Sequence, residues 1–474
     1  MFINKSLILG EMVSSSALER SIDAEGFIDV PRILSEDSIG ELFPELIPNL
    51  EDIRARDFPN FGLHGRIYLD SAATSQEPLS VLERMHEYRR TQIRGSNHSR
   101  NSAEAKEAQE RFDEAREKVG DFFNAHNYIV GFTSGTTDCS NFVATRFPFG
   151  REDILILTEM EHNSQILTAR NFAKKAGADV AYVPISKEGR LDLDFLYKVV
   201  SKRKGGTILL NLVHASNVTG IVNPVEEIRN ILGDRGFIYL DMAQSAGHIP
   251  INLDSLDVDF AGVSSHKMYG PMGIGAVFIN KRSERYIGND ISGGSAVDMV
   301  SKWFTATSSS PERFEPGTQD LEGAIEWGFA IDYLRDLGMD KVEAHDRQLG
   351  EYFIGELQKI PGIRVYGPAE FRDRIPVVTF NINSIIRKNY DTVARDLDAR
   401  GISVRDGCFC AHMGMSRLLG IPALGEEARA GLMTLGISKN LIKLPGAVRT
   451  SFAFYNNIQD AYAAVCAIRE ICEK

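Results

Sequence analysis

Cysteine is scarce in this chain, and the few cysteines are odd in number: Cys139, Cys408, Cys410, Cys466 and Cys472. So sparse a set does not suit the disulfide framework of a small secreted protein. No apolar run approaches the roughly 18 residues that a membrane-spanning helix needs, and the segment Met1 to Gly10 lacks the pattern of a secretory signal. We therefore expect a cytoplasmic protein with no membrane partner.

Basic charge is also in short supply, because 53 lysines and arginines face 65 aspartates and glutamates, for a formal net charge of −12. A nucleic-acid-binding surface needs clustered Lys and Arg, so we expect no nucleic-acid partner. The sequence also lacks internal repeats and long low-complexity segments. With 474 residues, 43% of them hydrophobic, the chain is long enough for two domains.

A regular alternation of apolar runs with helix-period segments is present between about residues 101 and 280. This pattern predicts an α/β fold in which right-handed crossovers build a mostly parallel sheet covered by helices. The expected strands are Ile154–Leu157, Val180–Pro184, Thr207–Val213, Phe237–Leu240, Phe260–Val263 and Gly275–Ile279. Between the first two we expect a covering helix, with Asn163 or Ser164 as its cap and Gly177 as its stop.

The two ends of the chain follow other patterns. Residues 1–65 mix short apolar runs with prolines and are expected to form an appendage of loops and short helices. A large domain is predicted over residues 66–310. Residues 311–474 contain two long helical patterns, strand candidates and a further helix near Thr392–Arg400, which predicts a smaller C-terminal α/β domain; its strand candidates are Arg364–Tyr366 and Val377–Asn381. Four glycines in residues 418–441 argue against one long helix there.

Polar residues after the expected strands are the candidates for chemistry, because ligands of α/β sheets bind outside the carboxyl ends of strands. Residues 132–138 end one strand and open a helix, which offers backbone N–H groups to an anion, although most such turns are only caps. Asp241 follows a buried type of strand and needs a cationic partner, unless it is a helix cap or part of a structural ion pair. Lys267 follows the next strand, where a desolvated amine can form an imine. His162 follows a fourth strand and either stacks on a flat ligand or is a structural residue.

These residues are part of a longer series of motifs that resembles the class V aminotransferases, and within them the group II cysteine desulfurases and selenocysteine lyases. The resemblance runs from about Arg66 to the end of the chain. The matching segments are Tyr68–Ala73, Arg94–His98, Ser134–Thr137, Met160–His162, His214–Gly220, Asp241–Gln244, Ser264–Lys267, Arg313–Thr318 and Val448–Phe452. The resemblance implies a fold-type I enzyme dependent on pyridoxal 5′-phosphate.

By this resemblance, Lys267 is the catalytic lysine that holds the cofactor as a Schiff base, and Asp241 pairs with the pyridine nitrogen to maintain the electron sink. Gln244 contacts the phenolic oxygen, and His162 stacks on the ring. The further residues implied at the cofactor and its phosphate are Asn217, Thr136, Thr137, Ser264, His266 and Thr318. Since Thr318 is expected to come from a partner subunit, the resemblance implies a homodimer.

The substrate-binding residues are also implied by the resemblance. Arg449 clamps the α-carboxylate of the substrate, a bidentate role that suits a guanidinium group. Arg94, His98 and Ala72 line the same entrance.

The segment Val404–His412 bears on the identity of the substrate. In the desulfurases, a cysteine at the position of Cys410 attacks the sulfur of bound L-cysteine and leaves an enzyme persulfide and L-alanine. Nearby Arg405 and His412 favour a thiolate. A buried apolar cysteine is the alternative, and a metal site is disfavoured because no second Cys or His cluster supplies ligands. The Gly-Cys-Phe-Cys pattern is also similar to the sulfurase domain that matures molybdenum cofactor, which leaves the sulfur-acceptor protein open.

Other reactions of the same scaffold compete with this interpretation. They are selenocysteine lyase, aminotransferase, epimerase and kynureninase-type lyase activity on a small amino acid, because α-proton abstraction by Lys267 is common to all of them. A sulfur-delivery or scaffold subunit without turnover is the rival from another class. Cys410 favours the cysteine desulfurase.

Overall fold

The structure is a computed structural model that describes residues 36–93, 95–96, 101–288, 293–382, 389–435 and 444–473. A seven-stranded sheet forms the larger of its sheets, in the order β2-β8-β7-β6-β5-β3-β4. Its strands are β2 (Tyr128–Thr133), β3 (Ile154–Thr158), β4 (Asp179–Val183), β5 (Ile208–Val213), β6 (Gly236–Asp241), β7 (Phe260–Ser264) and β8 (Gly275–Asn280). Only β8 runs antiparallel to its neighbours in this sheet. The mostly parallel sheet expected from the sequence is therefore confirmed.

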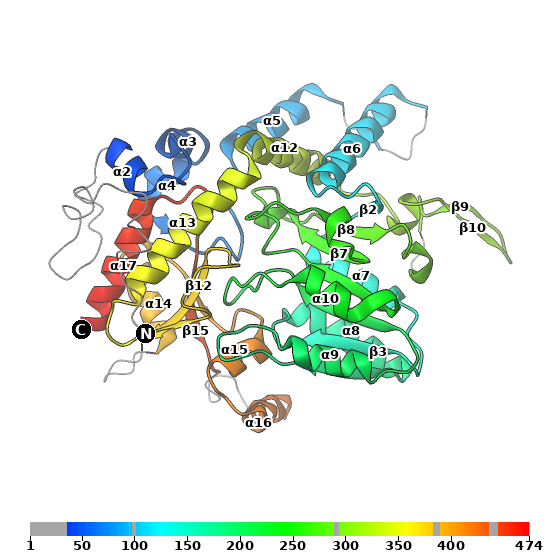
Figure 1. The fold of residues 1–474 in the computed structure, drawn as a ribbon. Coiled ribbons are helices and arrows are strands. Elements are labelled where there is room, and N and C mark those ends of the chain that lie inside the picture. The colour runs from blue at the N-terminus through cyan, green and yellow to red at the C-terminus, as the bar shows by residue number, and fades with distance from the viewer. Residues whose placement is uncertain are drawn as a thin grey trace.

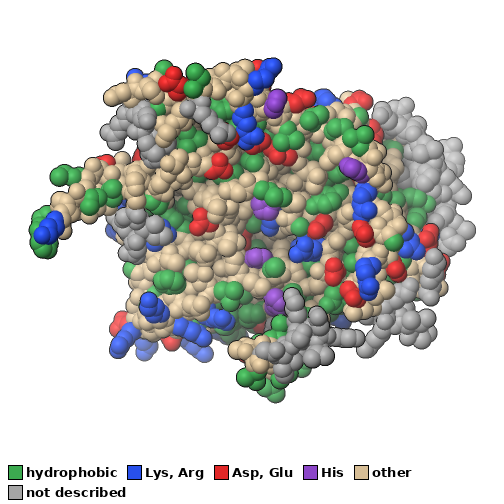
Figure 2. All heavy atoms as spheres, turned by 180° about the vertical axis from the view of Figure 1, so that it is seen from behind, with side chains coloured by type: hydrophobic (Ala, Val, Ile, Leu, Met, Phe, Trp, Pro, Cys, Tyr) green, Lys and Arg blue, Asp and Glu red, His purple; other side chains and the backbone are tan. Residues whose placement is uncertain are grey.

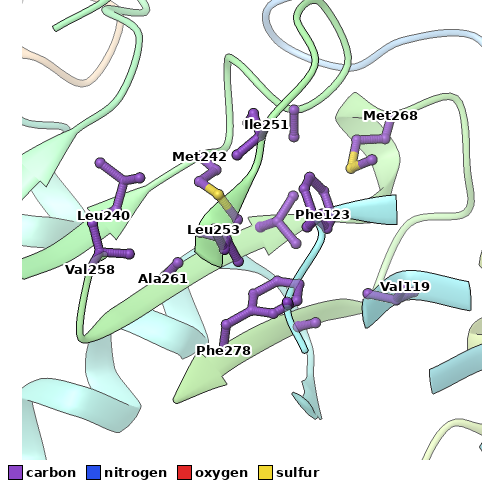
Figure 3. Packing of buried hydrophobic residues seen from close by; sticks show 14 of the residues in the cluster. Val119, Phe123, Leu240, Met242, Ile251, Leu253, Val258, Ala261, Met268 and Phe278 are labelled. Atoms are coloured by element: carbon purple, nitrogen blue, oxygen red, sulfur yellow. The ribbon is translucent and has the colours of Figure 1, made fainter. Parts of the chain in front are cut away.

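Helices cover both faces of this sheet, which explains why its strands are apolar on both sides. The side chains of Leu155 and Leu209 pack with α7 (Thr136–Arg146) and α8 (Asn163–Ala176). The next residue along each strand, Ile156 and Leu210, points to the opposite face of the sheet. The helices packed there are α6 (Ala103–Phe122), α9 (Leu193–Ser201), α10 (Val225–Leu232) and α12 (Leu321–Leu337). Figure 3 shows part of that core, where Phe123 and Phe278 lie close to Leu253 and Met242.

A second sheet of four antiparallel strands lies beside the first unit (Figure 1). Its order is β11-β12-β15-β14, with β11 (Ile363–Tyr366), β12 (Val377–Ile382), β14 (Arg405–Gly407) and β15 (Ala447–Ser451). The helices α13 (Met339–Leu357), α14 (Tyr390–Asp398) and α17 (Ile458–Glu473) contribute to its separate core. The predicted β11, β12 and α14 are confirmed, whereas β14 and β15 were missed, because each is short and interrupted by charged residues.

The predicted division of the chain into residues 1–65, 66–310 and 311–474 stays a proposal. Some elements pack across its boundaries. α12 begins after residue 310 but packs on α5 (Leu79–Thr91) and α6 of the first unit. The N-terminal helices α2 (Glu36–Leu42), α3 (Leu50–Asp57) and α4 (Pro59–His64) precede residue 66. Leu42 belongs to the second core and Leu50 to the first. The N-terminal segment therefore contacts both cores.

Three local features were predicted from the sequence: the cap of the helix before Gly177, its stop, and an irregular segment near residue 420. The cap of α8 is His162, whose Nδ1 accepts from the Ser164 backbone N–H, so the expectation of Asn163 or Ser164 as the cap was wrong. The stop at Gly177 is confirmed, since its φ of 80° lies in the left-handed region. The glycine-containing segment near residue 420 forms two helices, α15 (His412–Leu418) and α16 (Ala423–Thr434), with Gly420 between them.

A hairpin of β9 (Val297–Val300) and β10 (Thr305–Thr307) projects from the body as an arm, at the right of Figure 1.

No helix within the described ranges is both long and apolar enough to cross a bilayer.

Candidate active site

Polar residues lie at the carboxyl ends of five strands, at one edge of the large sheet. β2, β3, β5, β6 and β7 run in the same direction, so their carboxyl ends lie at the same edge. Asp241 is the last residue of β6, and the segments that follow the other four strands carry Thr136, His162, Asn217 and Lys267. The fold thus collects at one edge residues that are up to 131 positions apart in the sequence, from 136 to 267.

The turn between β2 and α7 forms a cradle for an anion. A cavity of about 320 Å³ is lined there by residues 134–138, Asn141, Ser264 and His266. The backbone N–H of Thr136 donates to Ser264 Oγ at 2.8 Å. Gly135 has a φ of 139°, and a Cβ at this position would lie 3.1 Å from Ser264 Oγ, so glycine permits both the turn and the close approach. Free N–H groups at the start of a helix favour a phosphate.

Lys267 ends a short 3-10 turn (Ser265–Lys267) directly after β7. Burial lowers the pKa of its amine to about 8, and the positive charge of Arg449 acts in the same direction. Asp241 opposes the shift. A substantial fraction of the amine is therefore unprotonated near neutral pH, as a nucleophile or a proton acceptor requires.

Asp241 is the last residue of β6 and is only 4% exposed. Its Oδ2 accepts a hydrogen bond from Gln165 Nε2 at 3.0 Å, and its Oδ1 accepts one from the Ala243 backbone N–H at 2.9 Å. Both donors are neutral, so these bonds orient the carboxylate without neutralising it. A buried carboxylate held in this way suits a cationic ligand atom.

Two further groups beside Asp241 are kept neutral by burial. Burial raises the pKa of the Glu161 carboxyl to about 8, and its Oε1 accepts from Thr158 Oγ1 at 2.7 Å and from the Val213 backbone N–H at 3.0 Å. Burial also lowers the pKa of His162. A protonated Glu161 adds no second negative charge beside Asp241, and a neutral imidazole is suited to stacking on an aromatic ring.

Arg449, on β15, brings a buried cation from the second unit to the same edge. Its Nη2 forms an ion pair with Asp70 Oδ1 at 2.9 Å, and its Nη1 donates to the backbone carbonyl of Asn217 at 3.1 Å. Within the described part of the chain, Arg449 Nε and Asn217 Oδ1 are buried without a hydrogen-bond partner. Unpaired buried polar atoms carry a free-energy cost, which a polar ligand would relieve.

Gln244 and Ala72 lie in contact, since Gln244 Nε2 donates to the Ala72 backbone carbonyl at 2.8 Å. His266 lies 3.2 Å from Thr74 Oγ1 through its Nδ1, and burial lowers the pKa of His266 to about 4. The segment around residue 72 therefore approaches both the end of β6 and the cradle.

The loop after β14 carries two cysteines, Cys408 and Cys410, and neither is part of a disulfide. Phe409 and Cys410 both have left-handed φ values, 54° and 56°, which cost on the order of 1–3 kcal/mol each in residues other than glycine. Two bonds hold this conformation: Asn217 Nδ2 donates to the Phe409 carbonyl, and the Asn163 backbone N–H donates to the Cys410 carbonyl, both at 2.7 Å. The Cys410 thiol is exposed and close enough to Lys267 to influence its pKa.

Not every predicted site residue is part of this arrangement. Thr318 lines a neighbouring cavity of about 430 Å³, which shares Ser134, Asp138 and Asn141 with the cradle. Its expected reach into a partner subunit stays a prediction. Arg94 and His98 lie outside the described residues.

Three supporting residues were given no role in the sequence analysis: Gln165, which lies outside the matching segments, and Glu161 and Asp70, which lie within them. Each is polar and buried or half-buried, and each contacts a predicted residue or lies beside one. Gln165 gave the clearest signal, because it is a polar residue next to the apolar Ile166 on the inward face of the expected helix.

Comparisons with known proteins place the chain in a family. The model of the family described as aminotransferase class V matches residues 67–463. A probable cysteine desulfurase from Halalkalibacterium halodurans is 38% identical over 354 residues, which cover 73% of this chain and 84% of that protein. A cysteine desulfurase from Haloferax volcanii is 32% identical over 392 residues, or 81% of this chain and 88% of that protein.

Solved structures agree as well. The apo structure of a cysteine desulfurase from Thermococcus onnurineus matches with a TM-score of 0.79 and 30% identity, covering 90% of this chain and 98% of that one.

Proposed function

The chain belongs to the class V aminotransferase family, and from that premise we propose that it is a cysteine desulfurase dependent on pyridoxal 5′-phosphate. It converts L-cysteine to L-alanine and leaves the sulfur as a persulfide on Cys410. The observation that carries this proposal is the position of Cys410 on a strained loop that Asn217 and Asn163 hold at the sheet edge, where its thiol is close enough to Lys267 to influence the pKa of the amine. Other reactions of the scaffold need Lys267 but not a thiol facing the substrate.

The residues at the sheet edge fit the cofactor of this family. The cradle at Gly135 and Thr136 accepts the phosphate, the Lys267 amine is positioned for covalent attachment, and the Asp241 carboxylate supplies the partner for the pyridine nitrogen. Asn217 Oδ1 is one of the buried atoms that a ligand would satisfy. When bound, pyridoxal phosphate supplies an electron sink for carbanions at the substrate.

The side chains of the protein then divide the work. Arg449 binds the substrate carboxylate and fixes the orientation of the amino acid. Lys267 Nζ takes the proton from the substrate Cα. The Cys410 thiolate attacks the substrate Sγ, so that an S–S bond forms as the Cβ–Sγ bond breaks and the electron pair of that bond goes to Cβ. Cβ takes up a proton from solvent to become a methyl group, and Lys267 Nζ returns its proton to Cα, which completes alanine.

This function is tested by incubating the purified, cofactor-loaded protein with L-cysteine and a thiol reductant. We expect alanine and sulfide in equal amounts. An enzyme that is inert toward cysteine but releases selenium from selenocysteine would instead be a selenocysteine lyase. Keto acids or racemised amino acids as the products would favour the aminotransferase or epimerase.

We also propose that the protein is a cytoplasmic homodimer. The arm of β9 and β10 exposes Met299, Val300, Trp303 and Phe304, with exposed fractions of 65% to 81%. Hydrophobic side chains gather along this arm, which projects from the body in Figure 2. The Gly317 backbone N–H donates to the Gly294 carbonyl at 2.8 Å, which ties the base of the arm to the turn that carries Thr318. A second copy packed on the arm would thus lie next to Thr318, as the expected sharing of sites requires.

A further prediction concerns the attachment of the cofactor. Borohydride reduction of the loaded protein should fix the pyridoxyl group on Lys267, because this amine has its pKa lowered to about 8 and lies at the cofactor cleft. Peptide mapping by mass spectrometry locates the label. A label on another lysine, or a protein that ignores added cofactor, would contradict the assignment.

A further inference from the structure

Cys408, His412 and Asn163 form a hydrogen-bonded series beside Cys410. Cys408 Sγ lies 3.1 Å from His412 Nε2. On the other side of the ring, His412 Nδ1 lies 3.3 Å from Asn163 Oδ1 and 3.0 Å from Asn163 Nδ2. A thiol, an imidazole and a side-chain amide in this order are the parts of a nucleophile, a base and a group that orients the base.

The environment of Cys408 explains why it would need a base. Burial raises the pKa of the Cys408 thiol, and the backbone N–H of Cys410 only partly opposes this effect. The thiol is therefore protonated near neutral pH and donates to His412 Nε2. Asn163 can serve either tautomer of the ring, because its Nδ2 and Oδ1 lie 3.0 Å and 3.3 Å from His412 Nδ1. The tautomer whose Nε2 can take the proton is the one in which Oδ1 accepts from Nδ1–H.

The turn that contains both cysteines keeps the two sulfurs in one short loop. The Ala411 backbone N–H donates to the Cys408 carbonyl at 3.0 Å, and the two residues between them, Phe409 and Cys410, have positive φ. These are the φ signs of a type I′ turn, in which glycine and asparagine are the usual residues. The backbone N–H of Cys410 also points close enough to Cys408 Sγ to influence its ionisation. The two cysteines are thus separated by one residue of a tight turn, and the backbone of Cys410 contacts the thiol of Cys408.

We propose that Cys408 is a relay thiol, which takes the transferred sulfur from the Cys410 persulfide with His412 as its base and Asn163 as the positioning residue. The inference rests on the proposed desulfurase function. Cys408 gives its proton to His412 Nε2 and attacks the terminal sulfur of the persulfide. One S–S bond forms on Cys408 as the S–S bond on Cys410 breaks, and Cys410 leaves as a thiolate with the electron pair. The step needs no oxidant or reductant, and it frees Cys410 for another turnover.

The exposure of Cys408, Cys410 and His412 suits delivery of the sulfur to a thiol acceptor. His412 and Cys410 are exposed, and Cys408 is half-buried. The final acceptor therefore has access to the loop from solvent.

The test is a single turnover of the cofactor-loaded protein with an equimolar amount of L-cysteine and no reductant. Samples are quenched with an alkylating reagent at successive times, and tandem mass spectrometry locates the extra sulfur within the loop peptide. In the wild type we expect it on Cys410 first and on Cys408 later. In His412→Gln we expect transfer from Cys410 to Cys408 to be at least about tenfold slower than in the wild type, measured from the point at which the extra sulfur is on Cys410. His126→Gln removes an exposed histidine that is hydrogen-bonded to Asp254 and is the control.

Two further measurements separate chemistry from mere structure. Asn163→Ala should slow the transfer, whereas Asn163→Asp, which keeps an acceptor for Nδ1–H, should restore it. In the substrate-free protein, alkylation of Cys408 by iodoacetamide should be at least about tenfold slower in His412→Gln, because the thiol has lost its base.

Extra sulfur that stays on Cys410 while alanine forms would overturn the inference and leave the desulfurase function intact. A Cys408–Cys410 disulfide with release of free sulfide would overturn it as well, since the attack would then be on the inner sulfur. No alanine from the wild type would defeat the proposed function itself, and the inference with it.

Discussion

Replacing Cys410 with alanine should reduce sulfide release from L-cysteine to the background level, while the protein keeps its cofactor. The cradle at Thr136, Lys267 and Asp241 do not depend on this side chain, and neither does Arg449, which we propose as the group that binds the substrate carboxylate. The step that is lost is the attack on the substrate sulfur. The measurement compares sulfide and alanine production by Cys410→Ala and by the wild type, with bound cofactor determined for both.

Two comparisons sharpen this result. Cys408→Ala should retain substantial alanine formation when a dithiol is present to take the sulfur directly from Cys410. Cys472→Ala alters a half-buried cysteine of α17 and controls for the loss of a thiol elsewhere. Full desulfurase activity in Cys410→Ala would move the nucleophile to another residue.

Asp241→Asn should bind the cofactor but lower turnover by at least about a hundredfold, the size of loss typical of removing one preorganised electrostatic contact. Asparagine can still accept the hydrogen bond from the Ala243 N–H. It lacks the negative charge that keeps the pyridine nitrogen protonated. Initial rates and cofactor content of the purified variant are the measurements.

Asp254→Asn is the matched control, because Asp254 is a carboxylate that pairs with His126 away from the cradle. A turnover of Asp241→Asn within a few-fold of the wild type would show that the charge of Asp241 is not needed.

The large sheet was predictable from the sequence because its strands are apolar on both faces and are separated by helix-period segments. β5 illustrates this, since all six of its residues are buried. β14 has no such signal: its three residues, Arg405, Asp406 and Gly407, are polar or small, and it exists only because it pairs with β15. Pairing between segments far apart in the chain leaves no local pattern.

The candidate site divides in the same way. Asp241 and Lys267 were found because a polar residue directly after a buried strand is conspicuous. The partners that hold such residues were not found. Asp70 pairs with Arg449 across 379 positions of sequence, and Gln165 donates to Asp241 across 76. Such contacts depend on the tertiary fold. The cap of α8 was misassigned because the imidazole of His162 takes a role that serine or asparagine fills more often.

The position of β15 in the second sheet sets the order in which a nascent chain can complete its site. β15 lies between β12 and β14 and pairs with both. Within the described residues, β14 therefore joins the sheet only through β15. Among the described strands, β15 is the last to be synthesised, and it carries Arg449. During synthesis the large sheet, with Lys267 and Asp241, can form well before the arginine for the substrate carboxylate is available. A chain interrupted before residue 447 would hold Lys267 and Asp241 but not Arg449, so under the proposed role of Arg449 the ability to select a substrate is acquired last.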